Sequence, residues 1–138
     1  MGAWDATPFG NDQANDWAYG LDDVDDLSLI EEAFEAVSEG YIESFEGAPA
    51  IAAAEVLTWL IGRPGERTAY TEKIATWSEA HPLEVEEAVI DRALEAMQRV
   101  LSPESELVEL WDGRPEWRAE VESVMERLRA GSSAERNR

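Results

Sequence analysis

Residues 49–61 read PAIAAAEVLTWLI, a run that is apolar on almost every side when it is wound into a helix. Its only polar side chains are Glu55 and Thr58, and the GRPG sequence at residues 62–65 ends the helical pattern. A helix that is apolar all round has to be buried against neighbours on every side. We therefore predict that residues 49–61 form the central helix of the protein.

On both sides of this run, the apolar residues recur at intervals of three and four and show no strand-like alternation. This spacing predicts an all-α fold, a single compact domain of about six to seven short helices over residues 1–130, with a disordered tail over residues 131–138. The stripes that carry the prediction are Leu27, Ile30, Phe34, Val37 and Tyr41; Tyr70, Ile74 and Trp77; Val85, Val89, Ala93, Ala96 and Val100; Ile90, Leu94, Met97 and Leu101; and Trp117, Val121, Val124 and Leu128.

Capping residues and prolines predict where several of the helices begin. Asn11 or Asp12 can cap a first helix that runs to about Gly20. Ser28 and Glu31 have the spacing of a capping box. We expect another helix over about residues 66–80, one that begins at Pro82, a short one after Ser102 and a last one that begins at Pro115.

Two aromatic residues, Trp4 and Phe9, precede the first helix, where no helical period explains them. We expect this N-terminal segment to pack on the bundle and cover one end of it, because large aromatic side chains gain most from burial. The alternative is an exposed aromatic patch that binds a partner.

The charge of the chain is strongly negative and unevenly distributed. The 138 residues contain 31 Asp and Glu against 11 Lys and Arg, a net charge of −20. The first 62 residues contain seven Asp, seven Glu and no Lys or Arg, a net charge of −14. Such a surface repels nucleic acid and anionic lipid, which excludes both as expected partners, and attracts basic proteins. Acidity that serves solubility alone is the other interpretation.

Several classes of protein are disfavoured by composition. Without cysteine and with a single histidine, the chain cannot form a disulfide framework, a thiolate site or a multi-histidine metal centre. No apolar run approaches the roughly 20 residues that span a bilayer. The N-terminus lacks the basic and apolar regions of a secretory signal. We therefore expect a cytoplasmic protein, either a monomer or a dimer, with no cofactor.

The acidic residues near the N-terminus are the candidate binding surface for a basic partner. No start position satisfies the EF-hand pattern, so residues 22–26 are interpreted as a solvated acidic loop, with a loose divalent-cation site as the alternative. The residues assigned to partner binding are Asp12, Asp16, Asp22, Asp23, Asp25, Asp26, Glu31 and Glu35.

No catalytic set is recognisable, and Glu55 is the one carboxylate that stands out. If it is buried, desolvation makes it a possible functional carboxylate that carries a proton. The interpretation that we favour is an exposed polar strip, because Ile51, Glu55, Thr58 and Gly62 share one helix face. His81 precedes Pro82 at a helix start, where a linker or capping role is expected.

Two blocks of sequence resemble a known family. The N-terminal block is MGAWDATPFGNDQANDW, and the C-terminal block is SELVELW at residues 105–111 with Trp117 after it. Both resemble domain-of-unknown-function family 4259, a group of small, mainly bacterial proteins, over residues 1 to about 129. The chain departs from the family pattern at Asp5, Thr7 and Gly10. The resemblance implies a structural signature and no known activity, cofactor or partner; its residues include Trp4, Pro8, Phe9, Asn11, Asp12, Asp16, Trp17, Glu109 and Trp111.

Three functional hypotheses follow from the sequence. The first is a non-enzymatic module that binds a basic protein through residues 12–46, of which a toxin-neutralising immunity protein is one concrete version. The second is an enzyme or a small-ligand or divalent-cation protein that uses Glu55, with a deep pocket beside the central helix. The third is a self-associating structural module.

Overall fold

The computed structural model describes residues 6–112 and 114–131, so Trp4 and residues 132–138 lie outside the described residues. Within the described part, the chain forms α-helices, one 3₁₀ helix and no strand; Ile42 and Ser105 form an isolated parallel bridge. This confirms the all-α prediction. The elements are α1 (Asp12–Ala18), η1 (Tyr19–Asp23), α2 (Ser28–Glu35), α3 (Ser44–Leu60), α4 (Glu72–Ala80), α5 (Glu87–Val100), α6 (Glu106–Leu110) and α7 (Pro115–Ala130).

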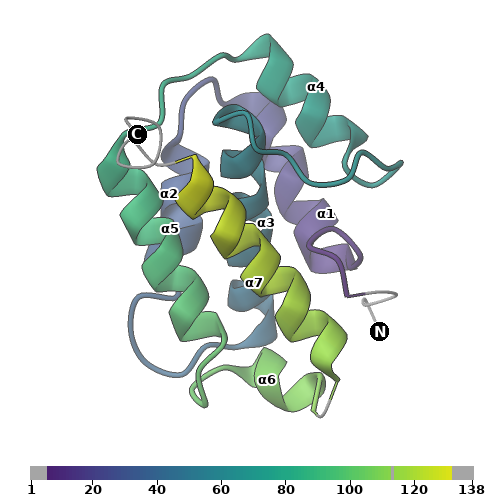
Figure 1. Cartoon of the computed structure of the whole chain (residues 1–138), viewed down its shortest axis with the longest axis vertical. Coiled ribbons are helices and arrows are strands. Elements are labelled where there is room, and N and C mark those ends of the chain that lie inside the picture. The colour runs from purple at the N-terminus through teal and green to yellow at the C-terminus, as the bar shows by residue number, and fades with distance from the viewer. Residues whose placement is uncertain (1–5, 113, 132–138) are drawn as a thin grey trace.

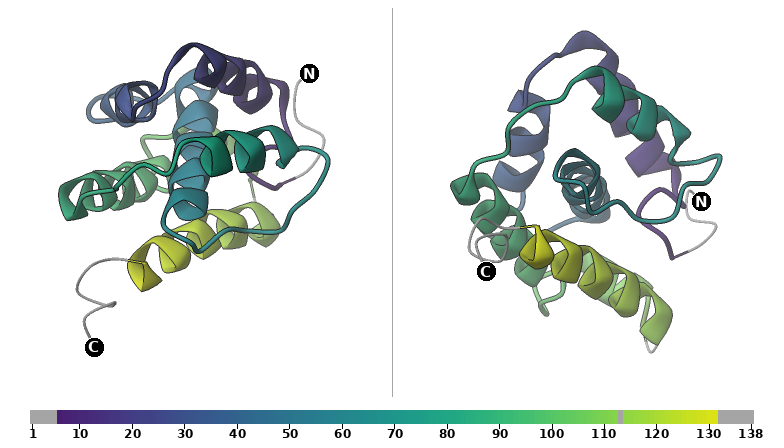
Figure 2. Two further views of the ribbon diagram at one scale, coloured as in Figure 1. Left: turned by 90° about the horizontal axis from the view of Figure 1, so that it is seen from above. Right: turned by 45° about the horizontal axis from the view of Figure 1, so that its top comes forward.

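Helix α3 is the centre of the domain, as its apolar sequence predicts. It contacts each of the other α-helices. Figure 2 shows α3 between a layer formed by α1, η1 and α2 on one side and α7 on the opposite side, with α5 and α4 beside it. The domain is thus a set of short helices arranged around one buried helix (Figure 1).

The predicted start of α3 at Pro49 is wrong, because the helix begins at Ser44. The carboxylate of Glu46 accepts a hydrogen bond from the N–H of Glu43 at 3.2 Å, and the carboxylate of Glu106 accepts one from the N–H of Ser44 at 2.7 Å. These two carboxylates satisfy N–H groups that have no partner within the helix. One of them comes from α6, so sequence periodicity could not reveal the extra turn.

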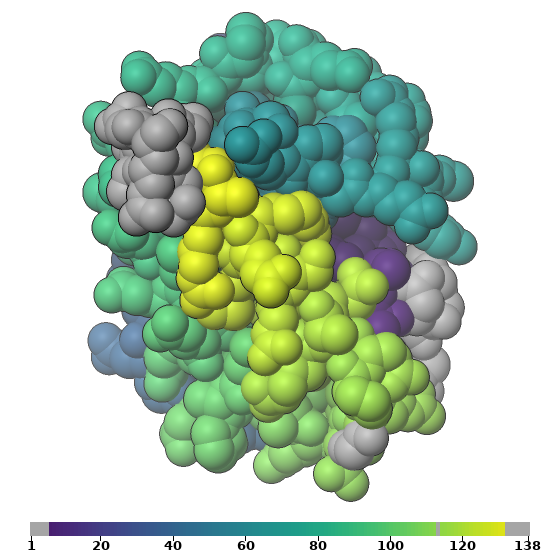
Figure 3. All heavy atoms as spheres, in the orientation of Figure 1, coloured from purple at the N-terminus to yellow at the C-terminus, as the bar shows by residue number. Residues whose placement is uncertain are grey.

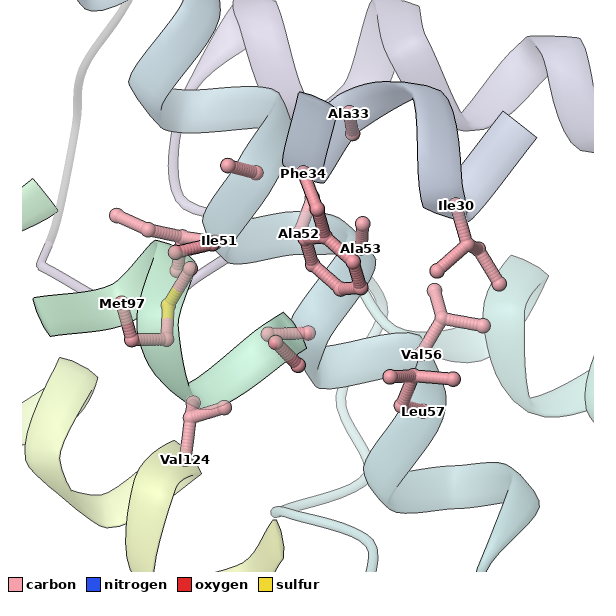
Figure 4. Packing of buried hydrophobic residues seen from close by; sticks show 14 of the residues in the cluster. Ile30, Ala33, Phe34, Ile51, Ala52, Ala53, Val56, Leu57, Met97 and Val124 are labelled. Carbon is pink, nitrogen blue, oxygen red and sulfur yellow. The ribbon is translucent and has the colours of Figure 1, made fainter. Parts of the chain in front are cut away.

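The core is formed by the stripes that the sequence predicts. Figure 4 shows side chains of α2, α3, α5 and α7 meeting around α3, including Phe34, Ala53, Met97 and Val124. Tyr41 and Tyr70, which were predicted to belong to these stripes, are instead exposed.

Both tyrosines are exposed because their helices are shorter than expected. Helix α2 ends at Glu35, and Gly40 then turns the chain with φ at +76°, a value that side chains rarely adopt. Helix α4 begins at Glu72 because Thr68 and Thr71 form a hydrogen-bonded turn, in which the Thr68 N–H donates to Thr71 Oγ1 at 2.7 Å.

Two further predictions are wrong, the capping box of α2 and the start of α5. Helix α2 does begin at Ser28, but Leu27 is its N-cap and Asp26 accepts the hydrogen bonds of Ser28, so the predicted capping box is absent. Helix α5 begins at Glu87 and not at Pro82. The link from α4 to α5 crosses the top of the molecule (Figure 1). Because extended backbone covers about twice the distance per residue that a helix does, the residues of this link span the gap without forming a helix.

Candidate functional site

Glu55 lies inside the protein, and the predicted exposed polar strip is wrong. The side chain is 3% exposed, and Ile51 and Thr58, which share its helix face, are buried as well. Among these residues only Gly62 is exposed. Helix α7 and the loop after α3 cover this face, so Glu55 and Thr58 are enclosed between α3, α7 and that loop.

The charge of Glu55 is compensated by Arg127 of α7. The Arg127 Nη2 atom lies 3.0 Å from Glu55 Oε1, and the indole N–H of Trp59 donates to Glu55 Oε2 at 2.8 Å. The Nη1 atom of Arg127 donates to Thr58 Oγ1 at 3.0 Å. A methyl group at Gly65 would lie 2.7 Å from Glu55 Oε2, so a glycine is needed where the loop closes over the pair.

This pair has the features of a structural link between α3 and α7. Both carboxylate oxygens of Glu55 are engaged by donors, and a buried charge is tolerated only when it is paired and hydrogen-bonded in this way. Glu55 also does not line the cleft between α3, α6 and α7 or the pocket between α2 and α5. The geometry therefore favours a role for Glu55 in stability over the carriage of protons.

An open cleft lies between the N-terminal segment, the first half of α3, α6 and α7. Its volume is about 630 Å³, which is in the range of ligand-binding pockets. Figure 3 shows the N-terminal segment in purple beside the yellow-green atoms of α7. The lining residues are Ala6, Thr7, Pro8, Asn11, Asp12, Gln13, Ser44, Ala48, Ile51, Leu107, Leu110, Trp111, Arg114, Trp117, Glu120 and Val121.

The two sequence blocks of the family resemblance meet in this cleft, although about 90 residues separate them in the chain. Pro8, Asn11 and Asp12 come from the first block, and Trp111 and Trp117 from the second. We refer to this cavity as the signature cleft. No periodicity in the sequence could show that the two blocks lie together.

The walls of the signature cleft are held by local interactions. The side chain of Asn11 accepts a hydrogen bond from the N–H of Ala14 at 2.8 Å, which confirms its predicted role as the N-cap of α1. The side-chain amide of Asn15 donates to the carbonyl of Phe9 at 2.8 Å, and Phe9 itself is buried. The guanidinium of Arg114 lies 5.6 Å from the centre of the Trp111 ring.

The other residues of the signature lie outside the cleft lining. Asp16 is exposed, Trp17 packs partly buried against the core, and Glu109 accepts a hydrogen bond from the Tyr41 hydroxyl at 3.0 Å. Phe9 covers the apolar core as expected, whereas Trp4 lies outside the described residues.

The acidic residues assigned to partner binding lie along α1, η1, the following loop and α2. Most are exposed, among them Asp12, Asp16, Asp23, Asp25 and Glu35. Two make ion pairs within the chain: Asp22 with Lys73 at 2.8 Å and Glu31 with Arg92 at 2.7 Å. We call residues 12–35 the acidic layer. Most of it lies on the side of α3 opposite to α7 (Figure 2), and Asp12 and Gln13 at the start of α1 reach the cleft that α7 also lines.

Asp26 has a structural role at the start of α2. Its Oδ1 atom accepts hydrogen bonds from the hydroxyl of Ser28 at 2.6 Å and from the N–H of Ser28 at 3.0 Å. These bonds stabilise the carboxylate and hold the pKa of Asp26 below its ordinary value of 3.8.

We expect Asp26→Ala to lower the unfolding temperature at neutral pH more than Asp25→Ala, which removes the same charge from an exposed neighbour. Because the folded pKa of Asp26 is the lower one, its contribution is present above 3.8 and is lost as the pH falls through the folded pKa. Thermal unfolding of both variants from about pH 7 to about pH 2 tests this. A difference between the variants that is independent of pH contradicts it.

His81 is engaged in a local contact. Its ring stacks on Trp77 with 4.7 Å between the ring centroids, and its Nδ1 atom lies 2.9 Å from the Trp77 carbonyl oxygen. Over residues 6–112 and 114–131, no group of three or more His, Cys, Asp or Glu side chains has an arrangement that could hold a metal ion. Within the same ranges, no helix is long and apolar enough to cross a bilayer.

Sequence reasoning missed Arg127 and the signature cleft. The available signal for Arg127 was its position three residues after Val124, at the edge of the buried stripe of α7. A base at the edge of a buried stripe and a lone acid in an apolar helix can compensate each other's charge, and a buried charge requires such a partner. The cleft had no comparable signal, because its lining residues come from four separate segments.

These features define a small, acidic, all-helical protein whose two sequence blocks form one cleft on a domain organised around a buried helix. The family model described as Domain of unknown function (DUF4259) matches residues 2–123, which is most of the chain and includes both blocks. The chain therefore belongs to this family. No curated protein and no solved structure matches it.

Proposed function

We propose that this protein is a non-enzymatic, cytoplasmic binding module that engages a basic protein surface through its acidic layer. The observation that carries the proposal is the exposure of eight of its nine carboxylates on one layer of the fold, in a segment that has no Lys or Arg of its own. The distinctive carboxylate that an enzyme hypothesis would use, Glu55, is already paired with Arg127.

Electrostatic attraction of this kind acts mainly on association. A concentrated negative surface steers a positive partner toward productive encounter, and salt weakens the effect. Neutralisation of a basic toxin is one biological role that matches this chemistry. The ion pairs Asp22–Lys73 and Glu31–Arg92 indicate which carboxylates are committed to the fold and which remain for a partner.

We expect a variant with Asp23→Lys, Asp25→Lys and Glu35→Lys to lose binding of the basic partner. These three carboxylates are exposed, so the changes should leave the fold intact. The measurement is affinity capture from a lysate of the native organism with the full chain, at about 50 mM and about 500 mM salt. The wild-type protein should hold a basic protein at low salt and release it at high salt, whereas the variant should hold it at neither.

A matched control reverses three exposed carboxylates of α7 on the opposite side of α3, with Glu116→Lys, Glu122→Lys and Glu126→Lys. This control changes the net charge equally and should keep most of the binding. If both variants lose the partner alike, net charge alone is responsible and the acidic layer is not the binding surface. If the wild-type protein retains no basic protein at low salt, the proposed function is wrong.

A further inference from the structure

We infer that the signature cleft is the anchor point of the same interface, where an apolar side chain of the basic partner inserts between flanking Lys or Arg residues. This inference rests on the proposed function, and it adds the kind of segment that the partner must present. It is carried by the apolar floor of the cleft, the charge of its rim and its continuity with the acidic layer.

The cleft has an apolar floor and an exposed apolar margin. Ala48 and Ile51 of α3, Leu107 of α6 and Val121 of α7 form part of the lining. Leu110, which also lines it, is 61% exposed, although it is a leucine. A single exposed leucine is ordinary, but at the margin of a cavity it extends the apolar surface that a partner can cover.

More exposed aromatic surface lies at the same end of the molecule. Phe45 follows Ser44 at the start of α3 and is 59% exposed. Tyr41 is exposed as well and bonds to Glu109 on α6, one residue before Leu110. Three of the exposed large apolar residues of the described chain therefore lie around the junction of α3 and α6, and one of them, Leu110, lines the cleft.

The charge of the rim selects a basic segment. Asp12 and Glu120 line the cleft, against a single lining base, Arg114. Arg114 lies over the ring of Trp111, so this ring already has a guanidinium of the same chain beside it. A Lys or Arg residue beside an inserted apolar side chain would meet the exposed carboxylate of Asp12 and, beyond it, the acidic layer.

The cleft is continuous with the acidic layer. Asp12, the first residue of α1, belongs to both, and Gln13 joins α1 to α3 through a hydrogen bond to Ser44 Oγ at 3.5 Å. A partner segment seated in the cleft would thus leave it along α1. An interface with an apolar anchor and a charged surround is the arrangement in which a few buried contacts supply most of the affinity.

The test uses a short blocked peptide with one leucine between two pairs of lysines, titrated against the full chain and followed by amide chemical shifts in NMR spectra. Two control peptides replace the leucine with glycine or the lysines with glutamates. We expect the leucine peptide to bind about fivefold or more tightly than the glycine peptide, with the largest shifts at Ala48, Leu107 and Trp111. The glutamate peptide should not bind.

Variants separate this inference from the proposed function. Leu110→Ser, at an exposed position, should reduce the affinity for the leucine peptide to that for the glycine peptide and leave the unfolding temperature unchanged. The triple reversal of Asp23, Asp25 and Glu35 should weaken both lysine peptides. If the wild-type protein binds the leucine and glycine peptides equally and the triple variant binds neither, the inference is overturned and the proposed function is retained. If the triple variant keeps its affinity for both lysine peptides and still prefers the leucine peptide, the proposed function is overturned.

Two further outcomes would show that something other than a basic partner occupies the cleft. If the leucine peptide binds only to the variant Trp4→Ala, the N-terminal residues of the chain occupy the cleft, and the inference is wrong. If sedimentation shows a dimer that Leu110→Ser converts to a monomer, a second copy of the chain covers this surface, and the inference is likewise wrong.

Discussion

Arg127→Ala is expected to lower the free energy of unfolding by about 3 kcal/mol, because it leaves the carboxylate of Glu55 buried without its counter-charge. Removal of one partner of a buried pair typically costs about 3–5 kcal/mol, and Arg127 is 21% exposed, which places the effect at the lower end. The unfolding temperature should fall by roughly 10 °C for a domain of this size. Thermal and urea unfolding measure both quantities.

The matched control is Arg129→Ala, which removes the same charge from an exposed position of the same helix. This control should change the stability by less than about 0.5 kcal/mol. In the double variant Glu55→Leu with Arg127→Met, much of the stability should return, because a well-packed apolar pair can replace a buried ion pair. If Arg127→Ala is as stable as Arg129→Ala, water reaches Glu55 and the pair does not link α3 to α7.

Phe9→Ala is expected to cost about 3–4 kcal/mol, the usual consequence of truncating a fully buried phenylalanine. The side chain is 1% exposed and belongs to the main core, and the carbonyl of Phe9 is held by Asn15 of α1. The variant removes the contact that fastens the N-terminal segment over the core. Urea unfolding of the full chain provides the measurement.

Phe45→Ala is the comparison for this experiment, since it makes the same chemical change at a phenylalanine that is 59% exposed. It should alter the stability by less than about 0.5 kcal/mol. A small effect of Phe9→Ala, comparable to that of Phe45→Ala, would show that the N-terminal segment is not fastened to the core. The alternative interpretation of this segment as a partner-binding aromatic patch would then be favoured.

Much of the fold could be predicted because helical periodicity is a local property. The stripe of α7, from Trp117 to Leu128, is buried as its spacing indicates, and Pro115 begins that helix as expected. The errors fall at helix ends, and at the start of α3 the capping group comes from another element. Glu106 caps α3 from α6, and no rule based on neighbouring residues could include it.

The misinterpretation of Glu55 has the same origin. For a helix considered alone, a polar side chain has the lowest free energy in water. The strip that contains Glu55 and Thr58 is therefore expected to be exposed. The outcome depended on Arg127, which is 72 residues away in sequence. The free-energy cost of a buried carboxylate is compensated when another helix places a guanidinium beside it.

The amino-acid sequence by itself determined the fold class, the central position of α3, the excess of negative charge in the first 62 residues and the family resemblance, since each depends on composition or on neighbours within a few turns. Tertiary structure alone decided that Glu55 is buried and paired, which carboxylates of the acidic layer are committed to ion pairs, and that the two signature blocks enclose one cleft. The physical reason is that burial, charge pairing and cavities arise between segments that are distant in the chain, and their free energies depend on distances that only packing defines.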